Sequence, residues 1–312
     1  MKNSFEELLK KSKKALLIGI GGGGDIVGTL PTAGLLELFD TEYVLAGLPW
    51  ERSVIDPVPG PRTYGEIVNC EKINEGVWYC NKDTKTSTGV LFAESGISKV
   101  FGTRTLLIDA TVGAENIAKY LLDAANKLGV DLIIGIDVGG DAIAVGTEEG
   151  ILSPLADSTM IAALYNIRND VNTIMGMFGF GSDGELTLSE LENSLSLLAQ
   201  NKGVLGSWGI TQKPIELMNR VMEVVPTEAS RSPVRYAEGK FKATTIRSGT
   251  VKVDLNFSST STIYIDVEVM FEKVSELARA VANSPDLMES KKILNDMCIS
   301  TEFDIEEERY GG

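Results

Sequence analysis

Three glycine-rich turns that end in carboxylates are the residues of this chain best suited to chemistry. An apolar run leads into each turn, and the turns occupy residues 19–25 (GIGGGGD), 135–141 (GIDVGGD) and 176–185 (GMFGFGSDGE). Glycine lets backbone amides approach a ligand closely, and aspartate supplies a hydrogen-bond acceptor or a metal ligand. A buried strand that runs into such a turn is how an open α/β sheet builds a ligand site at its carboxyl edge. The sequence therefore predicts that the chemistry lies where these turns meet.

The second turn carries the best pair of catalytic candidates, Asp137 and Asp141. Gly139 and Gly140 lie between them and let both carboxylates face one space, where they would bind Mg²⁺ or Mn²⁺. Alternatively, one carboxyl group with a raised pKa acts as a general acid. The alternative without chemistry is that these aspartates fix loop amides and cap a turn. Asp157 either joins the pair as a ligand-binding residue or caps a helix.

The first turn is expected to hold an anionic ligand through its backbone amides. Its glycines match the dinucleotide pattern Gly-x-Gly-x-x-Gly, but an acidic residue is expected about 20 positions beyond the turn. Glu51 is a loose candidate for it, so NAD is disfavoured, whereas other nucleotides stay among the candidate ligands. The lysine of a phosphate-binding P-loop is absent, which excludes an ordinary P-loop NTPase. The predicted ligand-binding residues here are Gly21, Gly22, Gly23, Gly24 and Asp25.

Further ligand-binding candidates follow the second strand and the third apolar run. Glu51 and Arg52 are expected to border the same cleft, and Arg52 or Arg62 would clamp an anionic substrate unless each forms a surface ion pair. Asp183 is expected to reach the cleft from the third turn. Residues 187–190 (TLSE) predict a capping box that opens the next helix.

The amino-acid composition limits the possible reactions mainly through the residue type that the chain lacks. The chain of 312 residues has no histidine, which excludes imidazole acid–base chemistry, serine or cysteine nucleophiles activated by histidine, and histidine-ligated metals. Carboxylates and a hard divalent metal are therefore favoured. Three cysteines without a Cys-x-x-Cys pair fit a reducing cytoplasm and give no support to a disulfide framework or a zinc site. The net charge of −15 disfavours nucleic acid and acidic membranes as partners.

The order of apolar runs predicts the elements that position these turns. Continuous apolar strands alternating with helices indicate a doubly wound, mostly parallel Rossmann-like α/β sheet with helices on both faces. No run approaches the roughly 20 apolar residues that span a bilayer. The expected strands are 15–20, 43–47, 105–109, 131–137 and 171–178, and the expected helices between them include 26–39, 115–128 and 154–168.

The chain is expected to divide into an α/β core, residues 1–187, and a C-terminal extension, residues 188–312, packed on it. The extension should contain helices and a β-hairpin whose arms lie at 241–246 and 250–257. Residues 203–209 are predicted to form a flexible glycine lid. The acidic tail, residues 302–312, is predicted to be mobile.

The combination of motifs resembles the family of domain of unknown function 1152, found mainly in archaea and some bacteria. The residues that carry the resemblance are 21–31 (GGGGDIVGTLP), 50–52 (WER), 137–141 (DVGGD), 153–157 (SPLAD) and 183–186 (DGEL). The resemblance implies a cytoplasmic α/β protein. Residues 137–143 are also similar to the glycine-rich acidic loop of D-glutamate cyclases, which carries Asn-Glu where this chain has Asp141 and Ala142.

The leading prediction is a metal-dependent enzyme that acts on a small anionic or phosphorylated metabolite. One alternative is a non-catalytic sensor or binding subunit that holds a nucleotide or metabolite in the same cleft. Another is a lyase similar to D-glutamate cyclases. A homo-oligomer is compatible with each.

Overall fold

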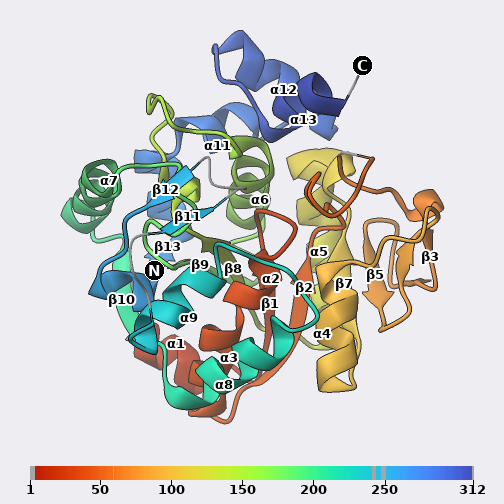
Figure 1. Ribbon diagram of the computed structural model, residues 1–312, viewed down its shortest axis with the longest axis horizontal. Helices are drawn as coiled ribbons and strands as arrows, with labels where there is room; N and C mark the ends of the chain where they lie inside the picture. Colours follow the sequence, from red (N-terminus) through yellow and green to blue (C-terminus); the bar gives the residue numbers. More distant parts are fainter. Residues whose placement is uncertain (1–3, 59, 241–243, 247–250, 311–312) are drawn as a thin grey trace.

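A nine-stranded sheet between two layers of helices forms the centre of the protein (Figure 1). The computed structural model describes residues 4–58, 60–240, 244–246 and 251–310. The five middle strands run parallel in the order β7-β2-β1-β8-β9. They correspond to the five strands predicted above, and the fold is the expected doubly wound, mostly parallel Rossmann-like fold. Their bounds are β1 (Lys14–Gly19), β2 (Glu42–Gly47), β7 (Thr105–Ile108), β8 (Leu132–Val138) and β9 (Asn172–Phe178).

The strand order reverses between β1 and β8. From β1 the chain moves outward to β2 and β7, then returns to the other side of β1 for β8 and β9. In such a sheet the two crossovers leave in opposite directions, which opens a crevice at the carboxyl ends of the two strands. The first and second glycine turns follow β1 and β8, so both border this switch point.

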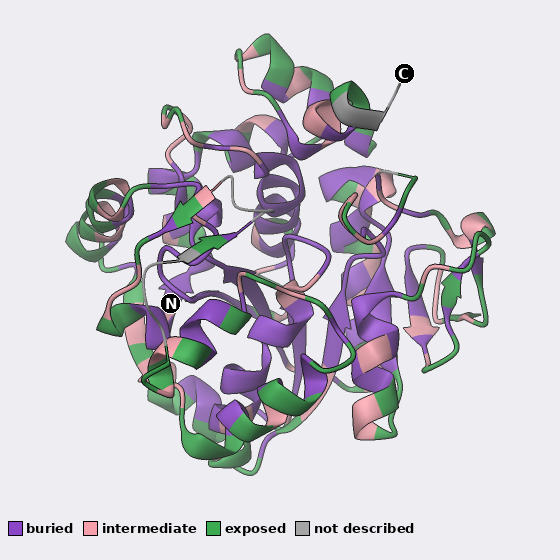
Figure 2. Ribbon diagram, viewed as in Figure 1, coloured by how far each residue is buried: buried purple, intermediate pink, exposed green. Residues whose placement is uncertain are grey.

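The parallel strands form where they do because both faces of the sheet are covered. Every residue of β8 is buried, and so are the last five of β1, as continuous apolar runs require (Figure 2). One face packs against α1 (Phe5–Lys11), α2 (Asp25–Gly28), α3 (Leu30–Glu37), α4 (Ala93–Phe101), α8 (Gln212–Val221) and α9 (Arg231–Ala237). The other packs against α5 (Gly113–Leu128), α6 (Pro154–Asn166), α7 (Leu188–Gln200), α11 (Glu276–Val281) and α12 (Leu287–Asp296).

Antiparallel strands complete both edges of the sheet. β5 (Val77–Cys80) and β4 (Glu71–Lys72) extend it beyond β7, while β13 (Ser261–Asp266) and β10 (Val204–Gly209) extend it beyond β9. The part of the chain after residue 187 therefore supplies one edge of the same sheet. The predicted glycine lid at 203–209 is wrong, because β10 is held by its ladder to β13 and by the packing of Leu205 and Trp208 against the core.

Two small sheets and several short turns fill the remaining chain. The predicted hairpin arms pair antiparallel, although its bend and residues 241–243 lie outside the described residues. The pairs are β3 (Ile67–Val68) with β6 (Lys85–Thr86), and β11 (Thr244–Ile246) with β12 (Val251–Val253). The short helical turns are η1 (Tyr64–Glu66), η2 (Ala110–Val112), η3 (Asp141–Ile143), η4 (Phe257–Thr260), α10 (Val267–Val269) and η5 (Met270–Val274).

The acidic tail is a helix, α13 (Glu302–Tyr310), that packs on α6 and α12 (Figure 1). The prediction of a mobile tail is wrong for residues 302–308, because side chains of this segment find partners. Phe303 packs edge-on against Trp50 with ring centroids 6.1 Å apart, and Lys291 forms an ion pair with Asp304 at 3.0 Å. Residues 311–312 lie outside the described residues.

Candidate functional site

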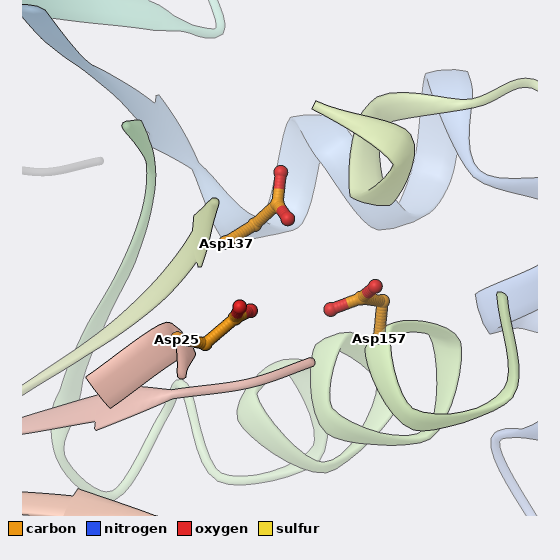
Figure 3. A group of neighbouring side chains, drawn as sticks. All are labelled: Asp25, Asp137 and Asp157. Atoms are coloured by element: carbon orange, nitrogen blue, oxygen red, sulfur yellow. The ribbon is translucent and has the colours of Figure 1, made fainter. Parts of the chain in front are cut away.

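Three aspartates from three elements converge at the switch point. Asp25 begins α2, Asp137 lies near the end of β8, and Asp157 lies in the first turn of α6. Each offers a carboxylate oxygen that lies within 4.8 Å of those of the other two, and the side chains point toward one another (Figure 3). Asp137 and Asp157 are 1% and 2% exposed, whereas Asp25 is partly exposed. We call these three residues the aspartate triad; oxygen atoms at this spacing suit a hard divalent cation.

The triad is electrostatically unbalanced. Among the described residues, Oδ2 of Asp137 and Oδ1 of Asp157 are buried without a hydrogen-bond partner. Burial raises the pKa of both carboxyl groups well above the usual range, and neighbouring carboxylates raise it further. Burial also raises the pKa of Asp25 to about 7, against the opposing effect of Arg52. Leaving charged groups in this state is costly, so the triad favours either protons or a bound cation.

The first glycine turn holds Asp25 in place. Gly22 and Gly23 adopt positive φ angles of 77° and 52°, which favour glycine. The N–H of Gly23 donates to the carbonyl of Trp50 at 2.9 Å, and the N–H of Gly21 donates to Oδ2 of Asp25 at 3.0 Å. Two of the amides expected to cradle an anion are thus already used within the protein.

Three other glycines of the first two turns, Gly24, Gly139 and Gly140, lie at close approaches between segments. A side-chain carbon at any of them would come too close to a neighbouring side chain, which accounts for glycine there. The added carbon would lie 2.5 Å from Thr227 at Gly24, 2.2 Å from Asp183 at Gly139 and 2.6 Å from Leu191 at Gly140.

Asp141 turns toward a second acidic cluster next to the triad. Its Oδ2 lies 3.1 Å from the hydroxyl oxygen of Ser153, whose single hydrogen has a closer acceptor in Glu185 at 2.5 Å, and the N–H of Asp141 donates to Asp183 at 3.1 Å. Glu185 accepts the N–H of Ser153 at 3.0 Å. Burial, followed by the charge of Glu185, raises the pKa of Asp141 well above its usual range and that of Asp183 to about 6. A side-chain hydrogen bond to Asp141 lowers the pKa of Asp137, against the larger effect of burial. The two clusters are therefore adjacent.

Arg52 supplies positive charge beside the triad. Its Nη2 donates to the carbonyl of Gly21 at 2.7 Å, and the guanidinium carbon lies 5.6 Å from the ring centre of Trp50. Nη1 is buried and has no hydrogen-bond partner among the described residues. Burial lowers the pKa of Arg52, but Glu302 and other nearby carboxylates raise it, with a net upward shift. One donor group of Arg52 thus remains to bind an anionic ligand.

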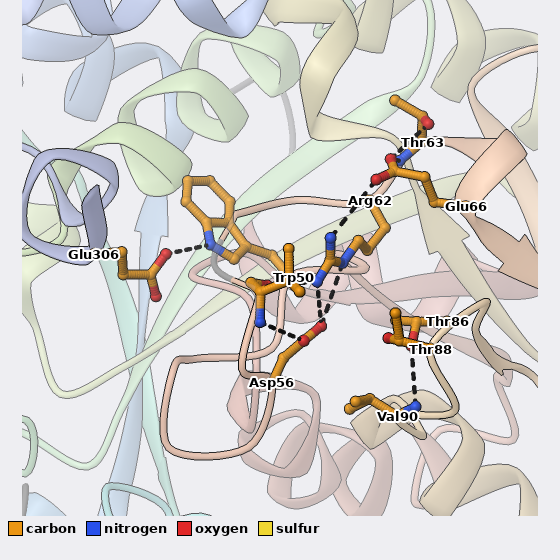
Figure 4. Close-up of polar contacts among 10 residues, drawn as sticks. Trp50, Asp56, Arg62, Thr63, Glu66, Thr86, Thr88, Val90 and Glu306 are labelled. Carbon is orange, nitrogen blue, oxygen red and sulfur yellow. Dashed lines mark hydrogen bonds and ion pairs between the residues drawn. The ribbon is translucent and has the colours of Figure 1, made fainter. Parts of the chain in front are cut away.

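The other arginine candidate, Arg62, is committed to the loop after β2. Its Nη2 lies 2.6 Å from Oδ2 of Asp56, and the two residues are 6% and 1% exposed (Figure 4). Arg62 also donates to the carbonyl of Val58. This buried ion pair fixes the loop and leaves Arg52 as the better ligand for an anion.

Glu94 and Glu302 lie near the site but carry no signal in the sequence. Glu94, in the first turn of α4, is 1% exposed, and neither carboxylate oxygen has a partner in the described part of the chain. Burial and then Glu51 raise the pKa of Glu94 well above its usual range. Glu51 accepts the N–H of Ala93 at 2.5 Å, and burial raises its pKa to about 7. Glu302, in the tail, accepts hydrogen bonds from α6.

Fold and site together define a doubly wound α/β protein with a carboxylate-rich site at the switch point of its sheet. The chain belongs to the family described as Protein of unknown function (DUF1152), whose family model matches residues 16–310. No curated protein and no solved structure matches the chain.

The predicted capping box at 187–190 is confirmed, since Thr187 and Glu190 bond reciprocally. Within the described residues, every helix is too short or too polar to cross a membrane.

Proposed function

We propose that this protein is a metal-dependent enzyme that acts on a small anionic, and preferably phosphorylated, metabolite at the switch point. The observation that carries the proposal is the aspartate triad, with three carboxylate oxygens within 4.8 Å and two buried oxygens without partners in the described residues. Carboxylates are the ligands that Mg²⁺ and Mn²⁺ prefer. Asp25, Asp137 and Asp157 would hold the cation, which would polarise a phosphoryl or carbonyl oxygen of the ligand.

Arg52 would bind the anionic group of the same ligand. Its Nη1 lacks a partner among the described residues, and its Nη2 is anchored on Gly21, so the guanidinium is already oriented. Arginine matches the planar geometry of carboxylate and phosphate groups. The ligand is thereby expected to span Arg52 and the triad.

Asp141 is the residue we assign to proton transfer. It is buried, its pKa is raised, and its Oδ2 lies 3.1 Å from the hydroxyl oxygen of Ser153, to which a protonated Asp141 can donate while Ser153 donates to Glu185. A carboxyl group that retains its proton near neutral pH can donate it to a leaving group. Asp183 and Glu185 would hold the loop that carries Asp141 in position, because they accept hydrogen bonds from the N–H groups of Asp141 and Ser153.

Binding of Mn²⁺ to the purified protein tests the metal site directly. We expect binding by electron paramagnetic resonance in the wild type and a loss of at least tenfold in affinity in Asp137→Asn. The matched control is Asp131→Asn, because Asp131 accepts the N–H of Lys13 at 2.9 Å before β8, at the opposite edge of the sheet. Absence of Mn²⁺ binding, or equal binding by both variants, would refute the metal site.

Turnover separates the enzyme from a sensor. With Mn²⁺ present, a panel of phosphorylated metabolites and nucleotides should include one that is converted, and Asp141→Asn should abolish conversion while retaining Mn²⁺ binding. A ligand that stabilises the protein yet is recovered unchanged would favour the sensor. The lyase similar to D-glutamate cyclases stays a prediction, which conversion of D-glutamate would support.

A further inference from the structure

A pocket beside the small β3–β6 sheet shares no residue with the aspartate triad. Figure 1 shows β3 beyond β5, on the far side of β7 from the switch point. The volume of the pocket is about 590 Å³, within the range of about 300–1,000 Å³ that small-molecule sites occupy. We call it the lysine pocket, and the lining residues that matter here are Asn69, Lys82, Asp83, Lys85, Leu91 and Lys99.

The lining of the lysine pocket is positively charged, although the whole chain is acidic. It contains three lysines, and Lys82 forms an ion pair with Asp83 at 3.0 Å. Through the described part of the chain, the ammonium groups of Lys85 and Lys99 have neither an ion pair nor a hydrogen bond. Two unbalanced positive charges therefore line the pocket and would attract an anion that the net charge of −15 otherwise repels.

Hydrogen bonds hold the backbone on one side of the lysine pocket in place. Asn69 follows β3 with a φ of 60°, a left-handed conformation that asparagine adopts more readily than most residues. Its carbonyl accepts Nδ2 of Asn81 at 2.9 Å and the hydroxyl of Thr84 at 2.6 Å. Its own Nδ2 donates to the carbonyl of Asp83 at 2.9 Å. These bonds tie two loops together, and a wall that is already ordered lowers the entropic cost of binding.

Apolar side chains lie next to one of the unbalanced lysines. Lys85 pairs with Val68 across the small sheet and forms an isolated bridge with Leu91. Residues that pair directly across a sheet present their side chains on the same face. Val68 is 39% exposed and Leu91 is 52% exposed. A ligand with an apolar group beside its anion would cover this apolar surface.

We propose that the lysine pocket is a second binding site, for a small ligand that joins a phosphate group to an apolar group. A phosphate monoester carries a charge of about −1.5 to −2 at neutral pH, which matches the two unbalanced lysines. Lys85 and Lys99 would bind its oxygens, since lysine binds phosphate as a point charge. Leu91 would contact the apolar part. The site does not depend on the aspartate triad, so the inference goes beyond the proposed function.

Calorimetric titration with phenyl phosphate, in a buffer with a metal chelator, tests the lysine pocket. We expect the double variant Lys85→Gln with Lys99→Gln to bind at least tenfold more weakly than the wild type. The matched control is Lys202→Gln with Lys273→Gln. These exposed lysines lie before β10 and in η5, and their loss changes the net charge equally, so affinity should stay within about twofold. Equal affinity in the wild type and the Lys85 and Lys99 variant would overturn the proposal, as would an equal loss in both double variants.

Hydrogen exchange shows where phenyl phosphate binds. Saturating phenyl phosphate should slow amide exchange in residues 81–91 of the wild type. Protection confined to residues 19–25 and 50–52 would place the ligand at the switch point and overturn the proposal. Inorganic phosphate should bind more weakly than phenyl phosphate, and equal affinity would contradict the apolar contact. The Lys85 and Lys99 variant should retain Mn²⁺ binding, so a failure of the triad and a failure of the lysine pocket are measured separately.

Discussion

Two buried groups of charges lie at the carboxyl edge of the sheet, and they are built in opposite ways. In the loop after β2, Arg62 and Asp56 form an ion pair of 2.6 Å. At the switch point, Asp137 and Asp157 each keep a buried oxygen without a partner in the described residues. A buried pair is balanced within the protein, whereas unpaired buried carboxylates require protons or a cation. This difference distinguishes charges that stabilise the fold from charges that are available to bind a ligand.

Removing one member of the balanced pair should have the largest effect. Arg62→Met leaves Asp56 buried without its partner and should lower the free energy of unfolding by about 3–5 kcal/mol. Urea unfolding measures this loss, and the double variant with Asp56→Asn should recover part of it. A loss below about 1 kcal/mol would place the pair among ordinary surface ion pairs.

The unbalanced group should make stability depend on pH with an unusual sign. The pKa of Asp25 and of Glu51 rises in the folded protein to about 7, and that of Asp183 to about 6. The folded state therefore holds more protons than the unfolded state between about pH 4 and 7, and stability is lost as the pH rises through this window. We expect the free energy of unfolding of the metal-free protein to decrease by several kcal/mol across this window, as measured by urea unfolding at several pH values.

Saturating Mn²⁺ provides the control for this pH dependence. Because the cation binds the deprotonated carboxylates, its addition should flatten the decrease above about pH 6. Stability that rises from pH 4 to 7 without metal would contradict the raised pKa values.

Neutralising one triad residue should stabilise the metal-free protein. Asp137→Asn keeps the shape of the side chain but removes a buried charge, and we expect a gain of about 2 kcal/mol at pH 8. Asp56→Asn, in the balanced pair, should have the opposite sign. Thermal unfolding of both variants, each compared with the wild type, measures the contrast. Destabilisation by Asp137→Asn would show that its charge is satisfied within the protein.

An exposed ion pair gives the smallest expected effect and a baseline for the comparison. Arg104 and Glu71 lie 3.0 Å apart with side chains 50% and 72% exposed. Glu71→Gln should change the free energy of unfolding by less than about 0.5 kcal/mol, because water screens the pair. A change above about 1 kcal/mol in the same unfolding assay would mean that burial does not explain the different effects expected for the buried ion pair, the triad and the exposed ion pair.

The sequence predicted the parallel strands because each is a local apolar run ended by glycine or an acid. It could not predict the reversal between β1 and β8, because strand order depends on pairing between distant segments. Residues 203–209 show the limit of local patterns. Their glycines resemble a loop, yet Leu205 and Trp208 pack on the core and make the segment an edge strand.

Part of the candidate site could be predicted from the sequence for the same reason. Asp25, Asp137 and Asp157 each lie at a turn or helix start, so the local pattern marked Asp137 as a catalytic or metal-binding residue, paired with Asp141, and Asp25 and Asp157 as ligand-binding residues. Their grouping as one triad depends on the crossing of β1, β8 and α6, which no local spacing encodes. Glu302 could not be found at all, because an acidic tail resembles a solvated segment until its partner amides are known.

The antiparallel insertion of β13 has a consequence for biosynthesis. β9 leaves the ribosome long before β13, its neighbour at that edge. At roughly 5–20 residues per second, a buried strand edge therefore stays open for several seconds. Open edges of apolar strands pair with other chains. A nascent chain or a fragment that stops near residue 187 would expose this edge, so the fold is safe from aggregation only after its last strand has been synthesised.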